Sequence, residues 1–261
     1  MKPTAALCVA CVMLPCCAAA QPHDNRHYEG TAYAADGHVA YKEEHFVFDD
    51  TNSVPSRLVI YRCPSGEPFA RKWVHDRESD EAPDFDLQDA RSGYREGVRT
   101  TGGRREAFVQ EKGEPTERIA ALPKRADPVI DAGFDAFVRN HWDELGKPGK
   151  GRMDFVVPSR LGYMDMRLKE ADAGSVDGDP VRHMRLVVDT WYGLAAPTID
   201  LSYGSSDHLL RRFKGLSNVL DAAGKRQDVR IEFPASAVRA PPSREEIERA
   251  AAVTLTTHCT P

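Results

Sequence analysis

The chain has 261 residues and a formal net charge of −5, with 35 Lys and Arg residues against 40 Asp and Glu residues. A mildly acidic chain with no concentrated basic face argues against nucleic acid as a partner. Beyond its first twenty residues the sequence has no long apolar run, which excludes a membrane-spanning helix there, and its length suits one large domain or two small ones.

The first twenty residues are typical of an export signal. Lys2 precedes an apolar and small-residue run that ends in Ala18-Ala19-Ala20, the pattern of a signal peptide cleaved after Ala20. The sequence therefore predicts a signal peptide over residues 1–20 and a single β-rich domain over residues 21–261, periplasmic or secreted. A lipid anchor at Cys17 is the alternative, although the residues before Cys17 fit a lipoprotein site less well than the alanines fit a cleavage site.

Alternation of apolar and polar residues predicts strands through the first half. Asp36-Gly37 is a strong two-residue hairpin signal, and further turn signals stand at Pro64-Ser65-Gly66 and Thr101-Gly102-Gly103. The strands predicted around these turns cover residues 28–34, 39–48, 58–63, 67–75, 94–99 and 106–112.

An apolar stripe at helical spacing predicts a helix over residues 128–145. Asp127 can cap this helix, Pro128 suits its first position, and Gly146 and Pro148 end it. The stripe consists of Ile130, Phe134, Phe137, Val138, His141, Trp142 and Leu145. We expect it to face the concave side of a curved sheet, because so apolar a stripe is too costly to leave in water.

The second half returns to strand patterns and ends in a short helix. Met164, Met166 and Leu168 share one strand face, and similar faces follow at residues 184–188 and 229–233. Ser243 with Glu246 three residues later forms a capping box, which predicts a helix start. The predicted fold class is mainly β (α+β): a curved antiparallel sheet or partial barrel with one packed amphipathic helix and a short C-terminal helix. Two small β domains are the alternative.

Two cysteines remain once a signal peptide is removed. In an oxidising compartment the simplest arrangement of Cys63 and Cys259 is a disulfide, and the alternative is two separate buried thiols. A disulfide also removes Cys63 as a candidate nucleophile.

The sequence resembles a group of exported proteins in pattern. The segment Leu209–Pro234 resembles the close of exported Gram-negative proteins of unknown function, with an aromatic and a Gly in one strand, a turn, and a strand that ends in Pro. The strand at Tyr28-Glu29-Gly30 and the hairpin at Tyr61–Gly66 are similar as well. The broader arrangement resembles half-barrel lipoprotein-carrier folds, which implies one helix plugging a curved sheet. The resemblance transfers no site residues.

Four motifs have residue types that suit chemical sites, but each lacks a feature that its chemistry needs. They are Gln21-Pro22-His23, Gly146–Gly151, Asp172 with Asp177 and Asp179, and Ser205–His208. The first lacks the N–H that copper chelation requires, and the second and third lack phosphate-loop and calcium-loop spacing. The fourth holds triad residue types that are sequence neighbours, whereas a triad converges from separate elements. A satisfied core histidine is the preferred interpretation of His141, so the sequence predicts no catalytic residue, metal site or cofactor.

Aromatic residues are the remaining functional candidates. Those spread along the strands are Phe46, Phe48, Tyr61, Trp73, Tyr94, Phe155, Tyr163, Trp191 and Phe213. They suit either an ordinary core or a concave apolar cup, and the sequence leaves the ligand-binding residues unknown. We expect an exported soluble protein that binds an apolar or amphipathic ligand or an envelope protein. The alternatives are a periplasmic hydrolase that uses His141 or His208, and an interaction protein without a pocket.

Overall fold

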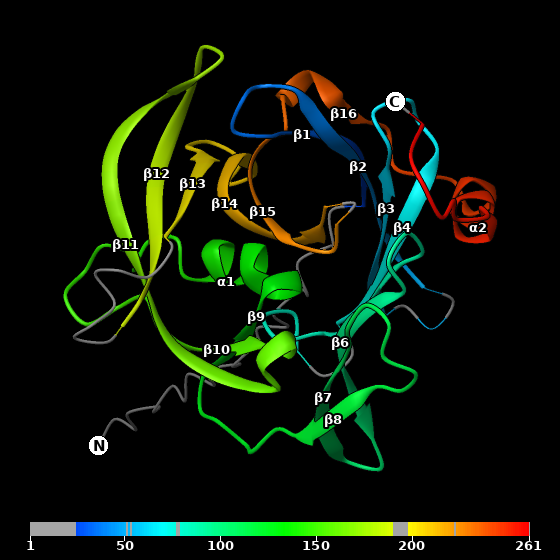
Figure 1. The fold of residues 1–261 in the computed structure, drawn as a ribbon. Helices are drawn as coiled ribbons and strands as arrows, with labels where there is room; N and C mark the ends of the chain where they lie inside the picture. Colours follow the sequence, from blue (N-terminus) through cyan, green and yellow to red (C-terminus); the bar gives the residue numbers. More distant parts are fainter. Residues whose placement is uncertain are drawn as a thin grey trace, which may run out of the picture.

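The computed structural model describes residues 25–50, 52, 54–76, 79–189, 198–221 and 223–260. Within these residues the chain forms sixteen β-strands, all in one sheet, and two α-helices. The sheet curves around a central space, with helix α1 on its concave side (Figure 1). The predicted fold class is therefore confirmed. The predicted signal peptide, Gln21-Pro22-His23 and Trp191 lie outside the described residues.

The first half of the chain is an antiparallel meander. Each strand from β1 to β8 pairs with the next one along the chain. These strands are β1 (Arg26–Tyr33), β2 (Val39–Asp49), β3 (Pro55–Arg62), β4 (Pro68–His75), β5 (Asp84–Asp89), β6 (Tyr94–Thr101), β7 (Arg104–Gln110) and β8 (Arg118–Ala121). The hairpins predicted from their turns are present, and Gly37 has the positive φ of 89° that the first turn requires.

A second meander follows and returns to the first. Its strands are β10 (Arg152–Val157), β11 (Gly162–Val176), β12 (Asp179–Val188), β13 (Ile199–Gly204), β14 (Leu210–Leu220) and β15 (Arg226–Glu232). The last of these pairs antiparallel with β1, where Thr31 lies opposite Glu232. The short strand β16 (Val238–Arg239) pairs with the start of β1. Strand β1 therefore lies in the middle of the sheet and joins the two meanders.

The two ends of the sheet approach each other but no strand ladder joins them within the described residues. The backbone N–H of Ile130 donates to the carbonyl of Glu81 at 3.0 Å. The 3₁₀ turn η2 (Pro158–Arg160) contacts β6 and β7. The sheet is therefore a partial barrel, and isolated contacts of this kind, rather than a strand ladder, connect its two ends.

The helix predicted over residues 128–145 is shorter in the structure. Its first three residues form β9 (Pro128–Ile130), which pairs parallel with β10, and a 3₁₀ turn η1 (Asp131–Gly133) leads into α1 (Phe134–Asn140). The prediction was wrong at the start because Pro128 tolerates the first position of a strand as well as that of a helix, and β-branched residues follow it.

Helix α1 packs through Phe134, Phe137 and Val138 against strands of the second meander, as the stripe predicted. Beyond its end, Trp142 lies half-buried in a turn, where its ring stacks on His208 with centroids 3.9 Å apart. Trp142 also packs against the core cluster of the second meander, in which Leu145 is buried, so the far end of the stripe is apolar packing without being helical.

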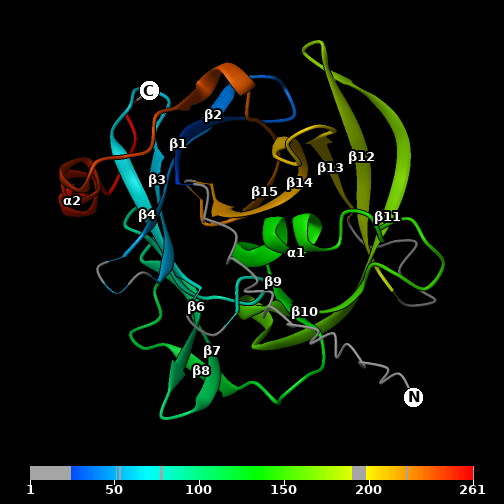
Figure 2. The ribbon, with the colours of Figure 1, turned by 180° about the vertical axis from the view of Figure 1, so that it is seen from behind.

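Helix α2 (Arg244–Ala252) begins at the predicted capping box and lies on the outer side of β3 and β4 (Figure 2). Ala250 packs there with Phe46, Leu58 and Ile60. After α2 the chain reaches Cys259, which forms a disulfide with Cys63 at a Cα–Cα distance of 5.5 Å. In the described part of the chain, no helix is long and apolar enough to cross a membrane.

Candidate ligand-binding cavity

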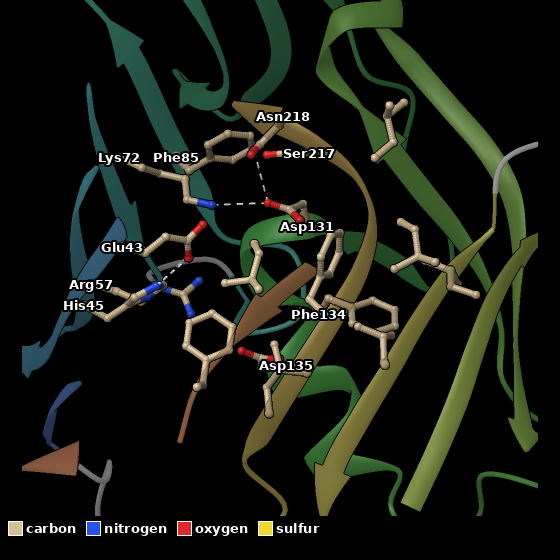
Figure 3. Close-up of a pocket in the computed structure, with 18 of the residues that line it drawn as sticks. Glu43, His45, Arg57, Lys72, Phe85, Asp131, Phe134, Asp135, Ser217 and Asn218 are labelled. Atoms are coloured by element: carbon tan, nitrogen blue, oxygen red, sulfur yellow. Dashed lines mark hydrogen bonds and ion pairs between the residues drawn. The ribbon is translucent and has the colours of Figure 1, made fainter. Parts of the chain in front are cut away.

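The curved sheet and α1 enclose a cavity of about 430 Å³ (Figure 3). Its lining comes from strands of both meanders, from η1 and α1, and from η2. This volume falls within the range of about 300–1,000 Å³ that is common for small-molecule sites. It equals the liquid volume of roughly a dozen water molecules. The concave side is therefore not completely filled by the protein's own side chains.

One side of the cavity is apolar and comes from the second meander and α1. We call it the apolar wall, and it consists of Phe134, Phe155, Met164, Met166, Leu186, Val188, Ile199, Leu201 and Phe213. The ring of Phe134 packs edge-on against that of Phe155, with centroids 6.2 Å apart. The apolar faces predicted for the segments that form β11 and β12, which carry methionines, thus belong partly to the core and partly to the cavity lining.

The opposite side is polar and comes mainly from the first meander. We call it the polar end, and it consists of Glu43, His45, Arg57, Lys72, Glu96, Asp131, Ser217 and Asn218. Strand register explains this clustering, because residues directly opposite each other on neighbouring strands share a face. His45, Val59, Lys72, Leu87 and Glu96 form one such row across β2, β3, β4, β5 and β6.

All three acids of the polar end have a specific partner. His45 Nε2 lies 2.9 Å from Glu43, and Lys72 Nζ lies 3.2 Å from Asp131. The hydroxyl of Tyr94 donates to Glu96 at 2.7 Å. These contacts lower the cost of burying charged groups, and they hold the side chains in fixed positions around the cavity.

Burial and neighbouring charges shift the pKa values of these groups in different directions. Burial lowers the pKa of His45 below its ordinary value and favours the neutral imidazole, although the hydrogen bond and charge of Glu43 act in the opposite direction. Burial raises the pKa of Glu96, although the hydrogen bond from Tyr94 and the charge of Arg226 act against this shift. The Nδ1 atom of His45 is buried and has no hydrogen-bond partner among the described residues. The polar end therefore contains a buried ring nitrogen that a bound ligand can reach as a hydrogen-bond partner.

The rim of the cavity has exposed apolar side chains. Leu216 and Val238 line the cavity, yet they are 36% and 42% exposed. Exposed large apolar side chains at a cavity rim are suited to contact an apolar ligand as it enters.

The predicted aromatic candidates are divided between the cavity and the outer face. Tyr61, Phe155 and Phe213 line the cavity. Phe46 packs under α2, and Phe48 packs edge-on against Trp73. Tyr94 holds Glu96, and Tyr163 packs against the main core cluster without lining the cavity.

The motifs set aside as local structure do not meet in the cavity. Ser205–His208 forms the turn between β13 and β14, and Gly146–Gly151 follows α1 in turns, both as predicted. Asp177 sits at the tip of the β11–β12 hairpin, and Asp179 pairs with Arg211 at 3.3 Å. His141 lies 3.2 Å from Glu81, outside the cavity lining.

One group of metal-ligating residue types lies beside strand β1, which carries His27. Ligand atoms of His27, Glu29 and Glu44 lie within 4.8 Å of one another. Each carboxylate is already paired with an arginine, Glu29 with Arg239 and Glu44 with Arg62, both at 2.7 Å. These arginines supply the positive charge that a metal ion would otherwise bring.

Sequence reasoning missed the polar end. Glu43 and His45 follow Tyr41 on the buried face of β2, so charged residues at core-facing positions were the available signal. Lys72 and Glu96 give the same signal, since each lies between buried apolar residues on its strand face, but only the sheet register brings them into one row with His45. Asp131 lies in η1 and gives no such signal.

The fold and cavity define a class of protein: a mainly β partial barrel with an amphipathic cavity on the concave side of its sheet. No family model matches the chain, and no curated protein matches its sequence.

Three solved structures show what the chain is similar to. A β-barrel-like protein of the domain of unknown function DUF1849 from Brucella abortus matches with a TM-score of 0.48 at 9% identity, over 82% of this chain and 95% of that one. A putative lipoprotein from Parabacteroides distasonis matches with a TM-score of 0.32 at 10% identity, over 82% of this chain and 95% of that one. A DUF1329 family protein from Desulfovibrio piger matches with a TM-score of 0.26 at 9% identity, over 87% of this chain and 89% of that one. All three come from Gram-negative bacteria, in agreement with the resemblance stated from the sequence, and we draw no function from them.

Proposed function

We propose that this protein binds an amphipathic ligand inside the partial barrel, after export from the cytoplasm. The observation that carries the proposal is the cavity of about 430 Å³ with an apolar wall on one side and a polar end on the other. An apolar chain would lie along Phe134, Phe155 and Phe213, and its polar group would face the polar end.

Energetics favour an apolar chain as the bound group. Each methylene that leaves water for the apolar wall contributes about 0.8 kcal/mol. This corresponds to a gain of up to about fourfold in affinity for each added methylene. Affinity should therefore rise with chain length until the wall is covered.

Two alternatives have less support from the geometry. The hydrolase prediction relied on His141 or His208, and both side chains lie outside the cavity lining. An interaction protein without a pocket would need a filled concave side, and this side contains a cavity.

Titration of the mature chain (residues 21–261) with 11-(dansylamino)undecanoic acid and shorter homologues tests the proposal by fluorescence. Val188→Trp puts an indole into the cavity from the end of β12 and should weaken binding at least tenfold. Ile119→Trp is the matched control, because Ile119 is 49% exposed on β8 and does not line the cavity. No binding by the unaltered protein, or equal binding by all three proteins, would refute the proposal.

A further inference from the structure

The cavity differs in charge from the rest of the molecule. Seven basic and five acidic side chains line it, in a chain whose formal net charge is −5. A cavity more positive than its protein attracts anions, because low-dielectric walls focus the field of the lining charges.

Ion pairs neutralise some of these basic side chains and leave others without a nearby carboxylate. Three lining acids have a basic partner within 4 Å: Glu29 pairs with Arg239, Glu96 with Arg226, and Asp131 with Lys72. By contrast, Arg57 and Arg139 have no carboxylate oxygen within 4.0 Å among the described residues. Arg57 instead donates to the backbone carbonyl of Ala132, just before α1.

Both arginines line the cavity together with Asp135 on α1, and both act electrostatically on its carboxylate. Burial alone would raise the pKa of Asp135, but the charges of Arg139 and Arg57 and the hydrogen bond from Tyr203, at 2.7 Å, hold it below its ordinary value. Asp135 is therefore ionised and carries one negative charge against the two guanidinium groups, while Asp76 and Asp131 act on Arg57 from further away. Of the other lining acids, Asp131 also acts on Arg57 but is paired with Lys72, and Glu43 is hydrogen-bonded to His45.

The apolar wall begins beside this group. Phe134, whose ring packs on Phe155, directly precedes Asp135 in the chain. The lining thus changes from aromatic to charged across a single peptide bond. A bound molecule whose apolar chain contacts Phe134 would have its polar group within reach of Asp135 and its surrounding arginines.

We propose that the polar group of the ligand is an anion, a carboxylate or a phosphate, held between Arg57 and Arg139. Guanidinium groups suit this task because they stay charged and can donate two parallel hydrogen bonds to such a group. This inference rests on the proposed function and adds the chemical class of the ligand to it.

The experiment uses a neutral reporter and three competitors that share a twelve-carbon chain. N-phenyl-1-naphthylamine reports occupancy of the cavity, and laurate, dodecyl phosphate and uncharged monolaurin compete for it. The proteins are the mature chain and its Arg57→Gln, Arg139→Gln and Arg105→Gln variants. Arg105 is the matched control, because it also donates to backbone carbonyls, those of Ala82 and Pro83, but does not line the cavity.

The mature chain should bind at least one of the two anions about tenfold more tightly than monolaurin, equivalent to about 1.4 kcal/mol. The preference should be lost in Arg57→Gln and Arg139→Gln and kept in Arg105→Gln, and salt should weaken binding of the anion alone. The anion that competes better identifies the group as a carboxylate or a phosphate.

Failure of the inference and failure of the proposed function give different results. If the reporter binds and all three competitors displace it equally, the anion is refuted and the cavity stands. If the reporter does not bind the mature chain, the proposed function fails. If Arg57→Gln does not fold, an unchanged preference in Arg139→Gln together with no salt dependence overturns the proposal.

Discussion

Removal of the Cys63–Cys259 disulfide should destabilise this protein more than any single packing change in the C-terminal segment. The cross-link joins residues 196 positions apart in sequence. In the chain-entropy description, a closed loop of this length restricts the unfolded chain by about 5 kcal/mol. Since whole domains are stable by only about 5–15 kcal/mol, the loss would be a large fraction of the total.

The test is guanidinium unfolding of the Cys63→Ala, Cys259→Ala double variant, followed by circular dichroism. Alanine is chosen because Cys63 is fully buried, and serine would place an unpaired hydroxyl there. The midpoint should fall and the m-value should rise, because the unfolded chain becomes free to expand. Ile247→Ala is the control: it removes packing of α2 on the outer face of the sheet but keeps the cross-link. It should lower the midpoint slightly and leave the m-value unchanged.

The reasoning would be refuted by a double variant whose stability lies within 1 kcal/mol of the unaltered protein. The same holds if the m-value stays constant, because the effect would then come from the folded state. The C-terminal segment has other attachments, including the bond from Thr256 N–H to the carbonyl of Pro68 at 2.7 Å. These attachments act in the folded state and do not restrict the unfolded chain.

Two further predictions concern a glycine and a histidine. In Gly30→Ala the new Cβ would lie 2.3 Å from the ring of Phe233, so the free energy of unfolding should fall by about 1–3 kcal/mol. Gly162→Ala is the control, because the nearest atom to its new Cβ lies at 3.8 Å and its free energy of unfolding should change little. Equal unfolding curves for the two variants would contradict the close packing at Gly30. The pKa of His45 in the folded protein lies below its ordinary value of 6.5. The neutral side chain of His45 therefore contributes to stability above pH 6.5, and this contribution is lost as the pH falls through the lowered pKa. His45→Gln should therefore lose less stability than the unaltered protein between pH 7 and pH 5, and equal losses in denaturant melts at the two pH values would exclude this contribution.

Local signals in the sequence predicted local structure well. Asp36-Gly37 specified its hairpin and Ser243 with Glu246 specified the start of α2, because turn and cap chemistry acts over a few residues. The interval from Pro128 to Ile130 was misassigned because its partner, β10, lies more than twenty residues away and decides whether the segment is extended.

The cavity could be predicted only in outline. A curved sheet with a packed helix suggested a concave space, but its size depends on which rings meet across the sheet. The row from His45 to Glu96 exists only because four successive strand pairings are in register. No local pattern in the sequence specifies four registers at once.

The central position of β1 has a consequence for the order in which the molecule can fold. One edge of β1 pairs with β2, which follows it at once in the chain, while the other edge must wait for β15 and β16 near the C-terminus. Until those strands arrive, β1 exposes a row of unpaired backbone groups to other chains. In a chain that becomes available for folding from its N-terminus, this edge of β1 would thus stay unpaired until most of the chain has emerged. Chains that stop before Arg226 should aggregate, whereas chains that include β15 and β16 can cover that edge themselves.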